Sequence, residues 1–141
     1  MKFVSIKYPD IDLLKQFLDS AGNSLQTFRY FSSRGFEVLK NHVCTELLLD
    51  NENKPVAYGH LDTESGIVWL GTAVVEIQTG KGLGKMMMNR LIEQGKKNNI
   101  PKIRLSVDNV NAAAIKLYTN FGFKLLEKRE TFSFLELTLS H

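Results

Sequence analysis

Two hydrophobic periods divide the chain of 141 residues into expected strands and helices. Apolar side chains at every second position predict strands, and apolar side chains at every third or fourth position predict helices. We expect strands at residues 2–7, 42–50, 55–62, 67–75, 102–107, 123–127 and 131–139. We expect helices at residues 10–21, in two pieces over 24–41, at 83–97 and at 111–121. This order predicts an α/β fold, with a mixed, mostly antiparallel sheet of six or seven strands and helices on both faces.

The last expected strand is apolar on both faces. Phe132 and Phe134 occupy one face, whereas Leu135 and Leu137 occupy the other, so we expect the alternation to slip within this strand. A β-bulge would explain the slip, and so would an apolar face that meets a second copy of the chain. A homodimer is therefore one of two open interpretations.

Composition narrows the class of protein. The chain is 43% hydrophobic and 23% charged, with a formal net charge of +3, as is ordinary for a soluble globular protein. The length suits a single domain over residues 1–141. No apolar run approaches a membrane span and no signal peptide is recognisable, so we expect a cytoplasmic protein without a membrane partner. Cys44 is the only cysteine, which excludes an internal disulfide and a multi-cysteine metal site, and we expect no metal.

A glycine-rich turn lies between the strand at 67–75 and the helix at 83–97. Glycine tolerates a positive φ and lets backbone N–H groups surround an anion, and a helix N-terminus adds further free N–H groups. A Walker A loop and a dinucleotide fingerprint both fit the glycine spacing poorly. A plain glycine turn remains the alternative to a pyrophosphate-binding loop. The backbone amides expected to bind the pyrophosphate are those of Gly80, Lys81, Gly82, Leu83, Gly84 and Lys85.

A second motif stands about twenty residues further on, over residues 105–123. It combines a strand, Asn111, a helix with the pair Leu117-Tyr118, and a turn at Gly122-Phe123. With the glycine-rich turn, it resembles the Gcn5-related N-acetyltransferase (GNAT) family over residues 67–123. That family usually has Gln or Arg where this chain has Thr79, a difference that affects one side-chain contact to the cofactor and not the backbone amides.

The resemblance implies acetyl-CoA as co-substrate and a single-domain GNAT-like fold. It implies that backbone around Ala73, Val74 and Val75 pairs with the pantetheine arm, with the Val74 N–H facing the thioester oxygen. It also implies that Asn111 contacts the pantetheine chain, although Asn111 also suits a helix N-cap. Tyr118 is the expected acid for the leaving thiolate, and a merely packed aromatic is the alternative.

The proton acceptor for the amine is less clearly indicated. His60 shares a strand face with Tyr58 and Asp62, and a histidine beside a carboxylate suits proton abstraction through a water. A structural histidine is the alternative. Glu46 and Glu76 are other candidates, and no base is needed if the amine is already neutral.

The acceptor pocket is expected near residues 27–34, by resemblance to the family. Arg29, Tyr30 and Arg34 could hold the phosphates and ring of a nucleotide-linked amino sugar, although an amphipathic helix explains them equally. We expect transfer of an acetyl group to a primary amine on a small molecule, by direct attack in a ternary complex. A catalytically silent acyl-CoA-binding module is the alternative. Nucleic acid is not an expected partner, because no aromatic platform accompanies the basic residues of 79–104.

Overall fold

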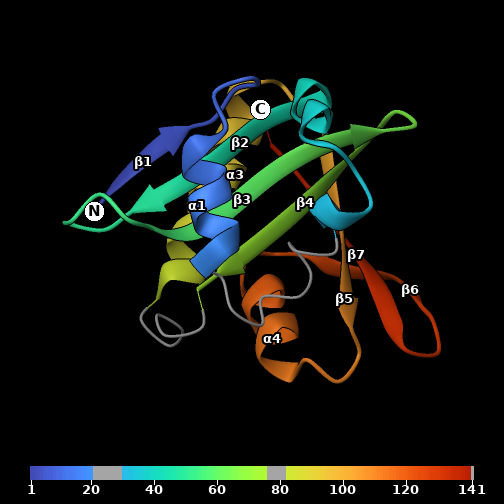
Figure 1. The fold of residues 1–141 in the computed structure, drawn as a ribbon. Helices are drawn as coiled ribbons and strands as arrows, with labels where there is room; N and C mark the ends of the chain where they lie inside the picture. Colours follow the sequence, from blue (N-terminus) through green and yellow to red (C-terminus); the bar gives the residue numbers. More distant parts are fainter. Residues whose placement is uncertain (21–29, 76–81, 141) are drawn as a thin grey trace.

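The computed structural model describes residues 1–20, 30–75 and 82–140. Its strands form one seven-stranded sheet in the order β1-β2-β3-β4-β5-β7-β6 (Figure 1). The strands are β1 (Lys2–Ser5), β2 (His42–Leu49), β3 (Pro55–Glu64), β4 (Ile67–Val74), β5 (Lys102–Asp108), β6 (Lys124–Lys128) and β7 (Phe132–Thr138). The helices are α1 (Asp12–Ser20), the 3₁₀ helix η1 (Phe36–Asn41), α3 (Leu83–Lys97) and α4 (Ala112–Asn120). The predicted α/β fold with a mixed, mostly antiparallel sheet is confirmed.

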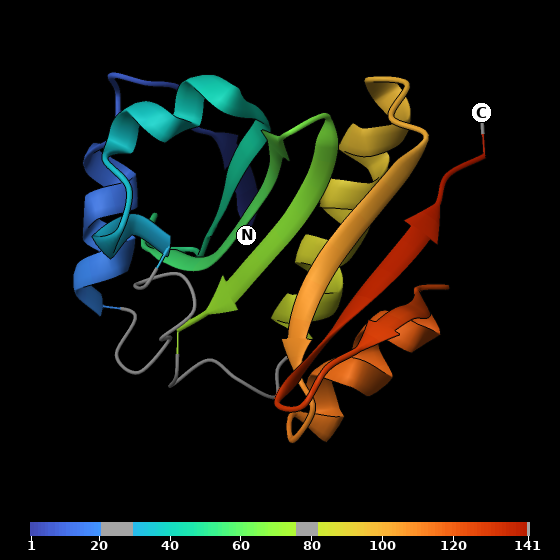
Figure 2. The same cartoon turned by 90° about the vertical axis from the view of Figure 1, so that its right-hand side faces the viewer.

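The sheet opens between its two central strands. All neighbours pair antiparallel except β4 and β5, which are parallel and, in the described part of the chain, meet in register only at Trp69 and Arg104. Beyond that pair the two strands diverge toward their carboxyl ends (Figure 2). In an open α/β sheet, a ligand site is expected outside the carboxyl ends of diverging strands.

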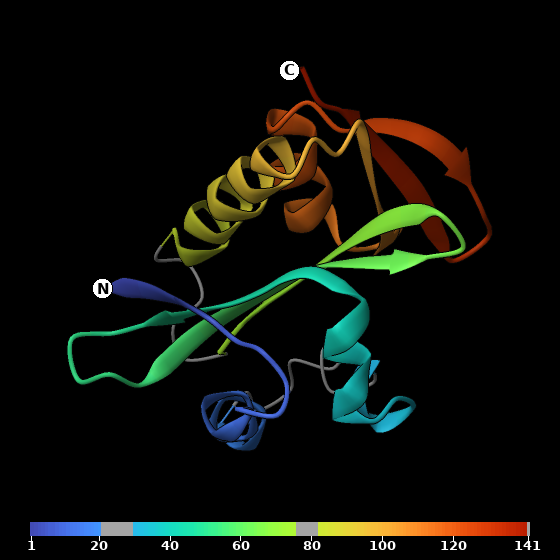
Figure 3. The same cartoon turned by 90° about the horizontal axis from the view of Figure 1, so that it is seen from above.

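Helices cover the two faces of the sheet differently. On one face, α1 packs on β3, where the rings of Phe17 and Tyr58 stack with centroids 5.9 Å apart. On the other face lie α3 and α4 (Figure 3). The α3 helix approaches β3 so closely that a Cβ on Gly59 would stand 2.6 Å from the Met87 sulfur. The backbone of β3 is therefore fixed between two layers.

One local expectation is confirmed and another needs correction. The second piece of the helical segment expected over 24–41 is helical, as the 3₁₀ helix η1. The alternation in β7 does not slip, because β7 pairs with β5 without a register shift, and the bulge lies between Leu125 and Glu127 of β6. Phe134 packs edge-on against Trp69, with ring centroids 5.5 Å apart. No described helix is long and apolar enough to cross a membrane.

Candidate active site

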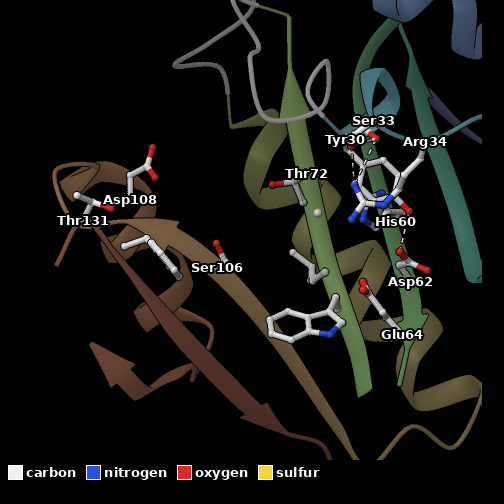
Figure 4. Close-up of a pocket in the computed structure, with 14 residues that line it drawn as sticks. Tyr30, Ser33, Arg34, His60, Asp62, Glu64, Thr72, Ser106, Asp108 and Thr131 are labelled. Carbon is white, nitrogen blue, oxygen red and sulfur yellow. Dashed lines mark hydrogen bonds between the residues drawn. The ribbon is translucent and has the colours of Figure 1, made fainter. Parts of the chain in front are cut away.

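A cavity of about 640 Å³ lies where β4 and β5 diverge (Figure 4). Its walls come from β3, β4, β5, the start of β7 and the segment before η1. The polar and aromatic residues that line it are Tyr30, Ser33, Arg34, His60, Asp62, Glu64, Trp69, Thr72, Ser106, Asp108, Thr131 and Phe132.

The backbone of β4 offers hydrogen-bonding groups on the side of the diverging strands. The Val75 N–H donates to the Val56 carbonyl at 3.0 Å, so Val75 faces β3. Because ladder bonds of an antiparallel pair alternate, Ala73 also faces β3, whereas Val74 is turned toward β5. Of the three residues expected to pair with pantetheine, Val74 is thus the one whose backbone N–H and carbonyl point toward the gap between β4 and β5.

The start of α3 exposes backbone donors. Gly82 caps the helix with φ 76°, and a Cβ there would meet no described atom within 4 Å. The first helical bond runs from the Met86 N–H to the Gly82 carbonyl at 3.1 Å, so the N–H groups of residues 83–85 have no intrahelical acceptor. Space without described atoms, N–H groups without a described acceptor and the positive end of the helix dipole fit a diphosphate. Thr79, Gly80 and Lys81 lie outside the described residues.

Tyr118 projects from α4 onto β4. Its side chain is buried, and its hydroxyl lies 3.4 Å from the hydroxyl of Thr72, which lines the cavity. Burial raises the pKa of the Tyr118 phenol above its ordinary value, against a smaller opposite effect of the Thr72 hydrogen bond. The phenol is therefore protonated at neutral pH, as a proton donor must be.

Asn111 serves as the N-cap of α4. Its Oδ1 accepts a hydrogen bond of 3.1 Å from the Ala114 N–H. The capping interpretation is confirmed, and contact with pantetheine stays a prediction.

His60 belongs to a buried polar cluster. It is 5% exposed, and its Nδ1 lies 2.6 Å from the Tyr58 hydroxyl oxygen. Burial lowers the pKa of His60 well below its ordinary value, and His42 and Arg34 lower it further. His60 is therefore neutral at physiological pH.

A second set of hydrogen bonds lies beside His60. The Tyr30 hydroxyl donates to Asp62 Oδ2 at 2.7 Å and lies 2.7 Å from His42 Nε2. The His42 Nδ1 lies 2.7 Å from the Thr45 hydroxyl. Burial and then Arg34 lower the pKa of His42 to about 4, so that this ring is also neutral. Among the described residues, Asp62 thus accepts a hydrogen bond from Tyr30, and not from His60 as its place on the strand suggested.

Three carboxylates and one guanidinium line the cavity: Asp62, Glu64, Asp108 and Arg34. Arg34 lies over the Tyr30 ring, with its guanidinium carbon 4.4 Å from the centroid. Of the residues proposed to bind the acceptor, Tyr30 and Arg34 do line the cavity, and Arg29 lies outside the described residues. Glu64 and Asp108 were missed because their strand positions look like ordinary solvated surface, whereas Asp62 was noted only as a neighbour of His60.

One of the two alternative bases falls outside this site. Glu46 is fully buried on the α3 side of the sheet, where it pairs with Arg90 at 3.0 Å. That part of the expectation is wrong, because Glu46 does not line the cavity. Glu76 lies outside the described residues. Among described residues, no group of three His, Cys, Asp or Glu side chains could hold a metal ion.

Similar proteins agree with this architecture. In solved structures, the ribosomal-protein-S18-alanine N-acetyltransferase of Escherichia coli matches 99% of this chain and 94% of its own, with a TM-score of 0.74 and 23% identity. A phosphinothricin acetyltransferase of Sinorhizobium meliloti, in complex with AcCoA, matches 98% of this chain and 88% of its own, with a TM-score of 0.76 and 15% identity. At these identities, both matches show the fold alone.

Sequence comparison gives the family. The spermine/spermidine N(1)-acetyltransferase of Bacillus subtilis (strain 168) is 40% identical over 65 residues, which make up 45% of this chain and 43% of that protein. The match thus spans less than half of the curated relative. The model of the acetyltransferase (GNAT) family matches residues 12–123, which include the glycine-rich turn and Tyr118. The chain therefore belongs to the acetyltransferase (GNAT) family.

Proposed function

We propose that this protein transfers the acetyl group of acetyl-CoA to a primary amine by direct attack in a ternary complex. The observation that carries the proposal is the divergence of β4 and β5, which leaves the Val74 backbone without a ladder hydrogen bond among the described residues, on the strand that lines the cavity. The N-terminus of α3 and the Tyr118 hydroxyl flank the same strand. Holding both substrates in attack geometry supplies much of the acceleration in such a reaction.

Each group has a distinct chemical role. The amides at the start of α3 hold the diphosphate, and the Val74 N–H donates to the thioester oxygen as negative charge develops on it. The amine nitrogen forms a bond to the acetyl carbon while the carbon–sulfur bond breaks. The departing sulfur takes the phenolic proton of Tyr118, and the amine loses its own proton to water or to a cavity group.

A small cationic amine is the acceptor class that the cavity favours. Three carboxylates outnumber the single guanidinium of Arg34, and a cation is stabilised by negative charge in a partly desolvated cleft. The Bacillus subtilis relative is a spermine/spermidine acetyltransferase, which is consistent with a cationic acceptor. Amino sugars remain candidates of the same charge.

A matched pair of glycine variants tests cofactor binding. Gly82 and Gly66 have φ values of 76° and 77°, and a Cβ at either would meet no described atom within 4 Å. Gly82→Ala and Gly66→Ala should therefore lower the free energy of unfolding by similar amounts, about 1–2 kcal/mol. Gly66 lies in the turn between β3 and β4, away from α3. Isothermal titration should show a Kd for acetyl-CoA raised about tenfold or more in Gly82→Ala alone. Equal Kd values in the two variants would exclude the diphosphate site at α3.

The alternative of a catalytically silent acyl-CoA-binding module is tested with the wild-type protein. Thiol release from acetyl-CoA is measured with spermidine, glucosamine and an alanine-terminated peptide. A sensing module would be favoured over an enzyme if the protein binds acetyl-CoA but none of these acceptors raises thiol release above the amine-free rate.

A further inference from the structure

Tyr58 and His60 form a buried, hydrogen-bonded pair on β3. Tyr58 is 1% exposed, and its hydroxyl oxygen lies 2.6 Å from His60 Nδ1. A phenol carries one proton, which needs an acceptor when water is excluded. In the part of the chain that the structure describes, His60 Nδ1 is the hydrogen-bond partner of this hydroxyl.

The two histidine tautomers satisfy this pair unequally. If Nδ1 is unprotonated, the Tyr58 O–H donates to it, and both buried groups are satisfied. If Nδ1 carries the proton, it donates to the phenol oxygen, and the phenol proton has no described acceptor. An unsatisfied buried donor is costly, so the first arrangement is favoured. The proton of the neutral ring then sits on Nε2.

The Nε2 edge of the ring lies against β4 at the wall of the cavity. Gly71 leaves the room for it, because a Cβ on Gly71 would stand 2.7 Å from both Nε2 and Cε1 of His60. His60 and Gly71 both line the cavity (Figure 4). No hydrogen bond joins Nε2 to another described residue, so this N–H is available to a bound molecule.

We infer that Tyr58 holds His60 as an Nε2–H donor, so that His60 binds a hydrogen-bond-accepting atom of the acceptor amine instead of taking its proton. This rests on the proposed function and revises the expected role of His60 as a base. Asp62, two residues further along β3, lines the same cavity and is the group that attracts the ammonium. A donor beside a carboxylate recognises an amine with an oxygen atom close to its nitrogen.

The surroundings of His60 support a neutral ring. The charged or titratable groups around it are Tyr58 and Asp62 on β3, His42 on β2, and Tyr30 and Arg34 before η1. Burial, with His42 and Arg34, lowers the pKa of His60, and burial raises the pKa of Tyr58. Neither group is therefore charged in the range where the amine is acetylated.

Nitrogen NMR reads the tautomer directly. Protein labelled with ¹⁵N at histidine should show His60 protonated at Nε2 and unprotonated at Nδ1, with no titration between pH 6 and 8. In Tyr58→Phe, which removes the hydroxyl and keeps the ring, the Nδ1–H form should become populated. A wild-type His60 protonated at Nδ1 would overturn the inference.

The affinities of two diamines test the consequence for acceptor specificity. The probes are 1,3-diaminopropane and 1,3-diamino-2-propanol, which differ by one hydroxyl. The hydroxylated diamine should bind about five- to tenfold more tightly, as expected for one added hydrogen bond. His60→Gln keeps a donor at the position of Nε2 and should keep this preference, whereas His60→Ala should lose it. Equal loss of this preference in both variants would contradict the donor role of His60.

Calorimetry in the presence of CoA measures these affinities without turnover. If no amine is acetylated, the proposed function fails. The tautomer of His60 and the ratio of the Kd values of the two diamines still decide the inference about His60.

Discussion

Replacing Tyr118 with Phe is expected to lower kcat by about 10²–10⁴-fold, the usual contribution of a positioned general acid. The phenyl ring keeps the packing of the buried side chain against Phe123, whose ring centroid lies 6.0 Å away. What disappears is the hydroxyl beside Thr72, and with it the proton for the departing sulfur. The Kd for acetyl-CoA and the free energy of unfolding should change little, because neither depends on that proton.

The measurement compares steady-state turnover with acetyl-CoA titration and urea unfolding of the same sample. Tyr8→Phe, outside the site, serves as the matched control and should leave kcat unaltered. A Tyr118→Phe variant within about twofold of the wild-type kcat would show that the phenol is only packed.

The pH dependence has a definite sign. The protonated phenol is the active form, and burial raises the pKa of Tyr118. Activity should therefore not fall through loss of this proton as the pH rises to about 10, the ordinary pKa of tyrosine. A fall in kcat centred below that value would have to come from another group.

Local signals predicted the parts of the site that lie on single elements. Gly82 at the start of α3, Asn111 as the cap of α4 and Tyr118 on the buried side of α4 all follow from short sequence patterns. Such patterns depend on backbone preferences within a few residues, so they survive without knowledge of the tertiary fold. The bounds of α3 were predicted to the residue for the same reason.

Features that arise from pairing between distant segments were not predicted. The cavity exists because β4 and β5, both within the described residues, pair in register at Trp69 and Arg104 alone and then diverge, and no local sequence pattern predicts where two parallel strands separate. The bond between Tyr30 and Asp62 joins residues 32 positions apart. His42 enters the cluster only through the register of β2 on β3. The partner of His60 Nδ1 likewise differs from the expectation, because it is the phenol of Tyr58 and not a carboxylate.

Glu46 and Arg90 form the buried ion pair with the largest expected effect on stability. Glu46 is 0% exposed, and its Oε1 accepts from Arg90 Nε at 3.0 Å. Its Oε2 accepts from the Ser5 hydroxyl at 2.6 Å. The guanidinium of Arg90 also lies 5.2 Å from the centroid of the Phe3 ring. These contacts join β1, β2 and α3, the helix whose N-terminus is proposed to hold the diphosphate.

Arg90→Met is expected to lower the free energy of unfolding by about 3–5 kcal/mol, because it leaves the Glu46 carboxylate buried without its countercharge. Adding Glu46→Gln to Arg90→Met should restore part of the loss, since the buried group is then neutral and still able to accept from Ser5. Urea unfolding at neutral pH measures all three proteins.

Arg129→Met is the matched control for Arg90→Met. Arg129 pairs with Glu127 at 2.8 Å, but the two side chains are 55% and 50% exposed, so its loss should cost less than about 1 kcal/mol. Equal costs at the two arginines would show that the Glu46 carboxylate regains water when Arg90 is removed. A much larger loss of unfolding free energy in Arg90→Met than in Arg129→Met would mean that the ion pair of the buried Glu46 carboxylate fixes α3 on the sheet. The affinity for acetyl-CoA should then also weaken in Arg90→Met, although Arg90 lies two turns from the start of α3.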